Sequence, residues 1–539
     1  MTEIDPPMSS PISVREATFN VWKQFGMTTI FSNPGSTEVP LLRDLPKDFD
    51  FVLGLHEASV VGMATGFALS TRHPALALLH TTAGLGNAVG AIATARVNKA
   101  PLVIVVGQQD RRHLVHQPFL TGNLEGLAGK YPVWSAEPAI GRDVPSLIVR
   151  AWYEARAQKG PAIVIVPMDD WEQEASPHGI AAPSKIEVSI AGSSAGLAEL
   201  AEMIQTSLNP AMVVGADADS QEIWEVLIQL AEKLDCPVWQ EPFGARAGFP
   251  QDHPLFQGHL PSGRARLRAT LAGHDLILVV GAPAFRQYPY ETGSFVEDGT
   301  KIAIISDNTE VATSSSAQLA VIGPIADICL GLSDRVDKRT GQNEKPNRIA
   351  PPTGENLRAG HVFEAIADRI SPDALIIEES PSSRSELQTR LPARRPFGFL
   401  SAAMGGLGFA MPAAVGVRLG NPGRSVVAIV GDGSSMYSFQ ALWSAVQYRV
   451  GVLFVIMDNG GYAIMDRLAE HYGYSAAVWP SFNSIDICKL AESFGCTAHK
   501  VTSHQELDEI LDKIIPQLES LDHPILLDVI VECDPIFVP

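Results

Sequence analysis

Short runs of apolar residues, separated by segments long enough to form helices, recur along the whole chain. A strand that is apolar on both faces must be covered on both sides, which is typical of parallel sheets flanked by helices. Such runs lie at 51–55, 75–79, 102–106, 162–166, 211–215, 276–280, 301–306, 374–377, 426–430, 452–457 and 525–530. They fall into three groups along the chain. The pattern therefore predicts an α/β protein with three doubly wound parallel-sheet domains.

Two stretches without apolar periodicity, 172–195 and 333–357, are rich in glycine, proline and polar residues. Such composition is typical of linkers between domains. We therefore expect domains at 1–180, 195–335 and 357–539. A length of 539 residues agrees with three domains, at roughly 150 residues for each.

The balance of charges excludes some classes of partner. The chain has 40 basic and 60 acidic residues, a net charge of −20, which repels nucleic acids and anionic membranes. No apolar run of 18 residues occurs, so we expect no membrane-spanning helix. The five cysteines form no CxxC pair, and the first residues lack a basic region followed by an apolar stretch. We expect reduced thiols and a cytoplasmic protein.

Polar residues follow two of the apolar runs in the last third of the chain. Gly431-Asp432-Gly433 comes directly after 426–430, and Asn459 comes after 452–457. An isolated Gly-Asp-Gly is more often a tight turn. If the two runs are neighbouring parallel strands, however, Asp432 and Asn459 lie side by side at the sheet edge where such folds bind ligands. Carboxylate and amide oxygens suit Mg²⁺, and glycines let a phosphate approach the backbone.

Gly-Asp-Gly, followed by Asn459 at 26 positions after Gly433, is the thiamine-diphosphate-binding motif. With it the whole chain resembles the thiamine-diphosphate-dependent 2-oxo acid decarboxylases, and among them the benzoylformate decarboxylases. The other matching segments are 31–36, 79–84 and 405–414. The resemblance implies decarboxylation of an aromatic 2-oxo acid to an aldehyde and CO₂. It also implies a pyrimidine-binding, a central and a diphosphate-binding domain, in that order, in a homotetramer that is a dimer of dimers.

The resemblance also assigns the cofactor site. Asp432, Asn459 and the carbonyl of Gly461 would hold Mg²⁺. The residues expected to contact thiamine diphosphate are Glu57, Ser382, Ser383, Gly405, Leu407, Gly431, Asp432, Gly433, Ser434, Ser435 and Tyr462. Leu407 would support the bent cofactor, and the Gly405 carbonyl would accept from its amino group. Pro381 stands where the family has a hydroxyl residue, so one phosphate contact is lost or replaced by Ser383.

Glu57 follows one apolar run and opens an apolar helix-length segment. From the residues alone it is equally a carboxylate that stabilises a helix N-terminus. The resemblance implies instead that it activates the cofactor by a hydrogen bond to the aminopyrimidine ring. Glu57 lies in the first predicted domain and the Gly-Asp-Gly motif in the third. The family pattern therefore implies active sites shared between two subunits, and an inactive monomer.

Two further residues are expected to handle the substrate. His80 ends the run at 75–79, where a lone histidine is more often structural, and Ser36 lies in a loop with Asn33, Pro34 and Gly35. The resemblance implies that Ser36 orients the 2-oxo acid and that His80 transfers protons.

Tyr288 stands where the family has a second active-site histidine. A phenol with a pKa near 10 donates a hydrogen bond well but relays protons poorly at pH 7. Protonation and aldehyde release are the steps affected, so a different substrate or carbon–carbon bond formation stays open. We hypothesise that His113 or His116 takes over the relay. The alternative is that both histidines belong to an exposed basic loop.

Other functions remain as alternatives. A carboligase or lyase, similar to benzaldehyde lyase or acetolactate synthase, would share the cofactor motifs. A cofactor-binding protein without activity is disfavoured by Glu57. The glycines at 84–90 weakly suggest a nicotinamide oxidoreductase, because their spacing is GxGxxxG and not GxGxxG. An apolar pocket wall of Ala463, Ile464, Met465 and Leu468 would suit an aromatic or branched substrate, although these residues equally match a core-facing helix.

Overall fold

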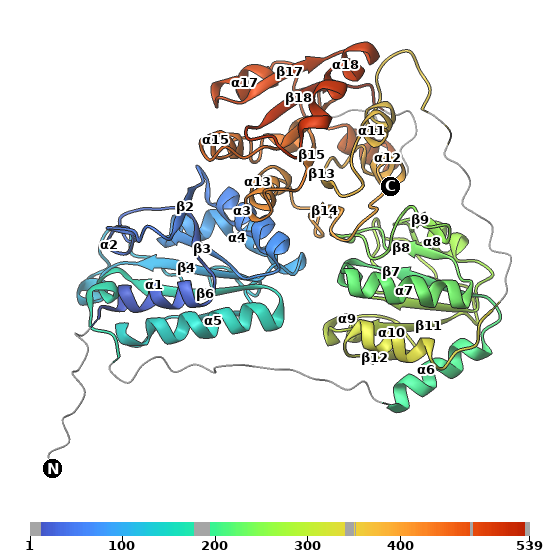
Figure 1. The fold of residues 1–539 in the computed structure, drawn as a ribbon, viewed down its shortest axis with the longest axis horizontal. Helices are drawn as coiled ribbons and strands as arrows, with labels where there is room; N and C mark the ends of the chain where they lie inside the picture. Colours follow the sequence, from blue (N-terminus) through green and yellow to red (C-terminus); the bar gives the residue numbers. More distant parts are fainter. Residues whose placement is uncertain (1–11, 177–193, 340–349, 351, 475–477, 534–539) are drawn as a thin grey trace.

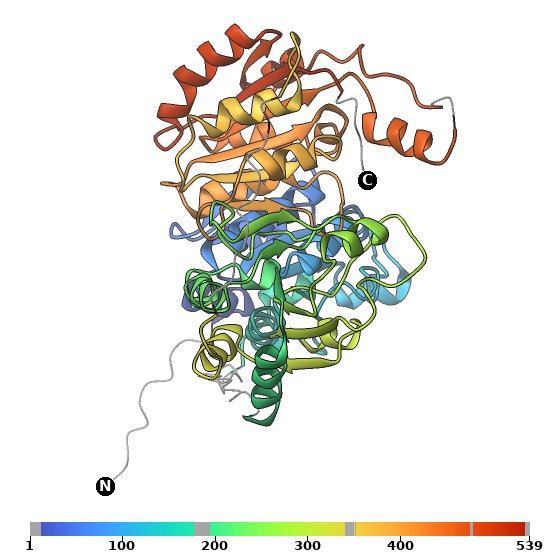
Figure 2. The same cartoon turned by 90° about the vertical axis from the view of Figure 1, so that its right-hand side faces the viewer.

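The computed structural model describes residues 12–176, 194–339, 350, 352–474 and 478–533. Figure 1 shows three lobes in chain order, with the C-terminal lobe (orange and red) above the N-terminal lobe (blue) and the central lobe (green and yellow). The view turned by 90° also shows the C-terminal lobe stacked on the other two (Figure 2). Each lobe contains one six-stranded sheet, which confirms the predicted fold class.

The sheet of the N-terminal domain has the strand order β2-β1-β3-β4-β6-β5, and all its pairings are parallel. The central strands β3, β4 and β6 are buried along almost their whole length, as their apolar sequences predict. The strands are β1 (Thr29–Asn33), β2 (Asp50–Leu53), β3 (Ala75–His80), β4 (Leu102–Gln108), β5 (Trp134–Ala136) and β6 (Pro161–Pro167). The helices are α1 (Val14–Gln24), α2 (Val39–Leu42), α3 (Glu57–Thr71), α4 (Thr81–Val97) and α5 (Val144–Gln158).

The central domain has the order β12-β11-β10-β7-β8-β9, again with parallel pairings. Its strands are β7 (Pro210–Val214), β8 (Val238–Gln240), β9 (Phe256–His259), β10 (Leu276–Val280), β11 (Lys301–Ser306) and β12 (Leu319–Ile322). Its helices are α6 (Ser194–Thr206), α7 (Gln221–Leu234), α8 (Arg264–Thr270), α9 (Thr309–Thr313) and α10 (Ile325–Ser333). The edge strand β9 ends at His259, beside a cavity described below.

The C-terminal domain has the parallel order β14-β13-β15-β16-β18-β17. The strands are β13 (Leu375–Glu379), β14 (Phe399–Ser401), β15 (Val426–Gly431), β16 (Leu453–Asp458), β17 (Thr497–Val501) and β18 (Ile525–Ile530). The helices are α11 (Ala359–Ala367), α12 (Arg384–Arg390), α13 (Ala410–Gly420), α14 (Asp432–Ser435), α15 (Ala441–Gln447), α16 (Ala463–His471), α17 (Ile487–Ser493) and α18 (His504–Ile514). Gly431 pairs with Met457, so β15 and β16 end at the same level.

The first predicted linker, between residues 180 and 195, overlaps the segment 177–193, which lies outside the described residues. The second, between 335 and 357, includes the segment 340–349, which also lies outside them. The exact boundaries therefore stay predictions. In the part of the chain that the structure describes, no helix is long and apolar enough to cross a membrane.

The N-terminal and C-terminal domains are joined by a close crossing of α3 and α13 (Figure 1). A Cβ atom on Gly66 would lie 2.1 Å from the carbonyl oxygen of Ala413, and one on Gly416 would lie 1.8 Å from that of Met63. A Cβ on Gly62 would come within 2.7 Å of the Pro412 ring. Because backbone atoms cannot move aside as side chains do, only glycine allows the two helices to approach so closely.

We predict that Gly416→Ala lowers the free energy of unfolding by about 1–3 kcal/mol, the usual cost of overpacking a buried contact. Gly90→Ala in α4 is the matched control, because a Cβ there would meet no atom within 4 Å. The control should change stability by less than about 1 kcal/mol. Denaturant unfolding measures both, and equal stabilities would contradict the close crossing.

Candidate active site

Asp432 and Asn459 lie together at the carboxyl ends of β15 and β16, as the sequence predicts. Asp432 accepts from the N–H of Gly461 through Oδ2 at 3.1 Å, and Asn459 accepts from the same N–H through Oδ1 at 3.3 Å. The other oxygen of Asp432 accepts from the N–H of Gly433 at 2.8 Å. Burial raises the pKa of Asp432 to about 6. One oxygen atom of Asp432 and one of Asn459 thus lie beside Gly461. A divalent cation such as Mg²⁺, bound to these oxygens, would stabilise the buried carboxylate.

The Gly-Asp-Gly turn is covered by aromatic rings. A Cβ on Gly433 would lie 3.1 Å from Tyr462 and 2.7 Å from Phe482, and these two rings pack edge to face with centroids 4.6 Å apart. Of the neighbouring hydroxyls, that of Ser435 donates to the carbonyl of Asp432 at 2.6 Å and is fully buried. Ser434 is also buried. Both serines therefore lie at the turn that the sequence assigns to the diphosphate.

The segment that carries Gly405 and Leu407 is held from the other two domains. The side chain of Asn98, at the end of α4, donates to the carbonyl of Ser401 and accepts from the N–H of Ala403, both at 2.9 Å. Arg286 of the central domain donates to the carbonyl of Ala403 at 3.3 Å. Gly405 itself has a φ of +71°, a conformation that glycine adopts without strain.

Glu379, the last residue of β13, holds the far end of this segment. Its carboxylate accepts from the N–H groups of Gly408, Phe409 and Ala410 at 2.6–2.7 Å, at the start of α13. Burial raises the pKa of Glu379 to about 7, while the three N–H donors favour its ionised form. The hydrogen bonds at its two ends therefore fix the conformation of the loop between Ala403 and Gly408.

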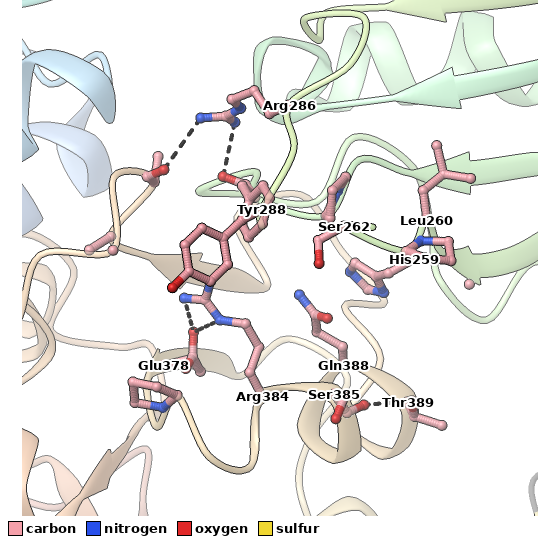
Figure 3. A pocket seen from close by; sticks show the side chains of 18 of the residues that line it. His259, Leu260, Ser262, Arg286, Tyr288, Glu378, Arg384, Ser385, Gln388 and Thr389 are labelled. Atoms are coloured by element: carbon pink, nitrogen blue, oxygen red, sulfur yellow. Dashed lines mark hydrogen bonds and ion pairs between the residues drawn. The ribbon is translucent and has the colours of Figure 1, made fainter. Parts of the chain in front are cut away.

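A cavity of about 1310 Å³ opens between the central and the C-terminal domain. Gly405, Leu407 and Tyr288, three of the predicted site residues, line it together. Ile464 and Leu468 of α16 also line it, in agreement with the predicted apolar wall, whereas Ala463 is buried and Met465 is partly exposed. Figure 3 shows the polar side chains of this cavity.

Pro381 lines the cavity as well. Of the two serines predicted beside it, Ser382 is half-buried, and Ser383 is buried at the start of α12. Their contacts with a diphosphate stay predictions.

Glu57 is the first residue of α3 and is buried. It accepts from the side-chain amide of Asn33 at 3.2 Å and from that of Asn87 at 3.0 Å. These two amides orient the carboxylate. The residues that follow Glu57 in α3 are mostly apolar. In this single chain Glu57 does not line the cavity that contains Gly405.

His80 ends β3 and contacts a buried carboxylate that the sequence analysis did not identify. Its Nδ1 lies 3.1 Å from Oε2 of Glu38 and 2.9 Å from the hydroxyl of Thr37. The hydrogen bond to Glu38 raises the pKa of His80, against the effect of burial. Gly35 packs on the imidazole so closely that a Cβ there would lie 2.4 Å from the ring. Ser36 follows Gly35 on the same loop and is exposed.

His113 and His116 lie on the short 3₁₀ helix η1 (Arg111–His116) and are exposed. Among the described residues they do not line the cavity around Gly405. A role for either in proton transfer stays a hypothesis.

The glycines at 84–90 lie inside α4 and not in a loop between a strand and a helix. A dinucleotide-binding loop requires that turn, so the nicotinamide oxidoreductase alternative has no structural basis here.

The five cysteines are all free thiols, as predicted.

Three models of one family match the chain in the predicted order. These are the N-terminal TPP binding domain of thiamine pyrophosphate enzymes over residues 12–126, their central domain over 197–332 and their C-terminal TPP binding domain over 383–529. The chain belongs to the thiamine pyrophosphate enzymes. Thiamine pyrophosphate is another name for thiamine diphosphate, so this result supports the predicted cofactor.

Relatives narrow the resemblance within this family. The chain is 37% identical to the benzoylformate decarboxylase of Pseudomonas aeruginosa, over 96% of this chain and 98% of that protein. The acetolactate synthase large subunit of Haemophilus influenzae is 24% identical over 90% of this chain and 89% of its own. Among solved structures, the thiamine diphosphate-dependent 4-hydroxybenzoylformate decarboxylase of Rhodococcus jostii RHA1 is 34% identical, with a TM-score of 0.92 over 97% of this chain and all of that one.

We predict that Glu38→Gln lowers the pKa of His80, because the hydrogen bond to Glu38 is the largest cause that raises it. NMR titration of the His80 ring measures this pKa. Glu57→Gln is the control, since Glu57 raises the pKa of His80 less than Glu38 does. An equal pKa of His80 in the wild type and in Glu38→Gln would contradict the role given to the hydrogen bond to Glu38.

The raised pKa of His80 makes the free energy of unfolding depend on pH. The contact stabilises charged His80, so its contribution is complete below the unfolded pKa of about 6.5. It is lost as the pH rises through the higher folded pKa. The difference in stability between the wild type and Glu38→Gln should shrink over that range.

Proposed function

We propose that the protein is a thiamine-diphosphate-dependent decarboxylase that converts an aromatic 2-oxo acid, such as benzoylformate, to an aldehyde and CO₂. The observation that carries the proposal is the convergence of Asp432 and Asn459 on the N–H of Gly461, at the end of two parallel strands. The cavity lined by Gly405 and Leu407 and the 37% identity to a benzoylformate decarboxylase support it.

The residues fit the cofactor and Mg²⁺. Asp432, Asn459 and the Gly461 carbonyl offer only oxygen ligands, which Mg²⁺ prefers. Above Gly405 there is free space, since a Cβ there would meet no atom within 4 Å. When bound, thiamine diphosphate supplies an electron sink for the electrons left behind as the carboxylate departs as CO₂.

The side chains of this protein bind the substrate and move protons. His80, with its pKa raised by Glu38, is suited to transfer a proton near neutral pH. Ser36 would orient the carboxylate or the ketone of the substrate. Tyr288 lines the cavity and would donate a hydrogen bond, while His113 or His116 remains the hypothesised proton relay.

We further propose that each active site is shared by two copies of the chain in a cytoplasmic homotetramer. Glu57 and His80 belong to the N-terminal domain and do not line the cavity of their own chain that holds Gly405 and Leu407. A second copy that brings Glu57 to this cavity would complete the site. The apolar side chains of Val115 and Phe119 on the N-terminal domain, 83% and 88% exposed, agree with such an interface.

We predict that the purified protein releases CO₂ from benzoylformate when thiamine diphosphate and Mg²⁺ are present. Glu57→Gln should lower kcat by at least about 100-fold while the cofactor still binds, because general acid–base groups commonly contribute that much. A coupled assay of CO₂ release and a titration of cofactor binding measure the two effects. A protein that binds the cofactor but releases no CO₂ would contradict the proposal.

Mixing two inactive variants tests the shared site. Glu57→Gln and Asp432→Asn should each be inactive as homo-oligomers. Co-expressed in equal amounts they should recover about a quarter of the wild-type activity, since half of the dimers are mixed and each has one intact site. Mixtures without recovered activity, although both chains are present in one oligomer, would show that the site lies within a single chain.

A further inference from the structure

The cavity is larger than a cofactor and a phenyl ring require. Its volume of about 1310 Å³ exceeds the roughly 300–1,000 Å³ of typical small-molecule sites. Its apolar lining includes Leu407, Ile464 and Leu468. The part between the end of β9 and helix α12 is polar (Figure 3).

Arg384 is the central cation of this polar part. Its Nε and one terminal nitrogen both donate to Oε2 of Glu378, at 2.8 and 2.6 Å. Glu378 is fully buried, while 24% of the Arg384 side chain is exposed to the cavity. The carboxylate therefore fixes one edge of the guanidinium and balances its charge. The opposite edge keeps unused N–H donors.

Other polar groups near Arg384 face the same cavity. The Tyr288 hydroxyl points toward the Arg384 guanidinium, and the Gln388 amide points from α12 across the cavity toward Ser262 (Figure 3). Among the residues that the structure describes, neither the Gln388 amide nor the Ser262 hydroxyl has a hydrogen bond, and both line the cavity. These groups are partly exposed, so a ligand in the cavity can take the place of the water that hydrogen-bonds them.

His259 affects which charge a bound substituent can carry in this polar part of the cavity. Burial, with a smaller contribution from the Arg384 charge, lowers the pKa of His259 to about 3. The imidazole is therefore neutral at physiological pH, and the charge of Arg384 is already balanced by Glu378. A second anion on the substrate would find no free cation among these groups, whereas an uncharged oxygen would find several hydrogen-bond donors.

We propose that Arg384 and Gln388 determine specificity, and that this site takes an aryl 2-oxo acid with an uncharged oxygen substituent, such as a hydroxyl group, on the ring. This inference rests on the proposed function. Arg384 and Gln388 donate to the substituent, while Leu407, Ile464 and Leu468 cover the ring. Arg384 and Gln388 lie about one turn apart on α12, so the spacing of the donors is set by the helix.

The test uses 2-hydroxy acid analogues, which cannot lose CO₂ as 2-oxo acids do. Calorimetry measures binding of mandelate, 4-hydroxymandelate and 4-carboxymandelate to the holoenzyme with thiamine diphosphate and Mg²⁺. We expect 4-hydroxymandelate to bind about tenfold more tightly than mandelate, the contribution of a hydrogen bond to a charged group. Tighter binding of 4-carboxymandelate than of 4-hydroxymandelate would overturn the choice of an uncharged group.

Variants assign the preference to residues. Arg384→Gln should reduce the tenfold ratio to about twofold or less, and Gln388→Leu, which leaves the Glu378–Arg384 pair intact, should also lower it. Arg395→Gln is the matched control, because Arg395 is an arginine 61% exposed outside the cavity. It should leave the ratio unchanged. A ratio that survives Arg384→Gln and Gln388→Leu would overturn the assignment.

Turnover of benzoylformate by the same samples separates this inference from the proposed function. Release of CO₂ without any preference for 4-hydroxymandelate would overturn the inference alone. Absence of both turnover and binding, with the cofactor bound, would contradict the proposed function and with it this inference.

Discussion

The close approach of α3 and α13 is the contact on which the arrangement of the molecule depends. Gly66 and Gly416 let the two backbones touch, so the N-terminal and the C-terminal sheets are held in a fixed relation. α3 begins at Glu57, and α13 begins directly after the segment with Gly405 and Leu407. One helix crossing thus positions in each chain the loop that would hold one cofactor and the carboxylate that would activate the cofactor bound by another copy.

The loop with Gly405 depends on all three domains. Asn98 holds it from the first, Arg286 from the second and Glu379 from the third. A displacement of any domain would therefore reach the cofactor loop through a buried or partly buried hydrogen bond. This explains how a site built on loops is kept in one geometry, as catalysis requires. It also explains how the central domain, which carries Tyr288, can influence the chemistry at this loop.

The sequence allowed the central strands of each sheet to be predicted, because they are apolar on both faces. Short strands such as β5 and β8, with three residues each, were not found, since so few residues carry no periodicity. Asp432 and Asn459 were predicted correctly as neighbours because parallel strands end together. Glu38 was missed because its partner His80 is far away in the sequence. The Glu378–Arg384 pair was missed too, since local pattern does not show which side chains face a cavity.

We propose that a second copy of the chain completes each active site. A crystal structure of the protein grown with thiamine diphosphate and Mg²⁺ tests it most directly. We expect Mg²⁺ on Asp432, Asn459 and the Gly461 carbonyl, and a cofactor beside Gly405 and Leu407 whose aminopyrimidine contacts Glu57 from another chain. A cofactor bound to Glu57 of the same chain, or bound away from Gly405, would contradict it.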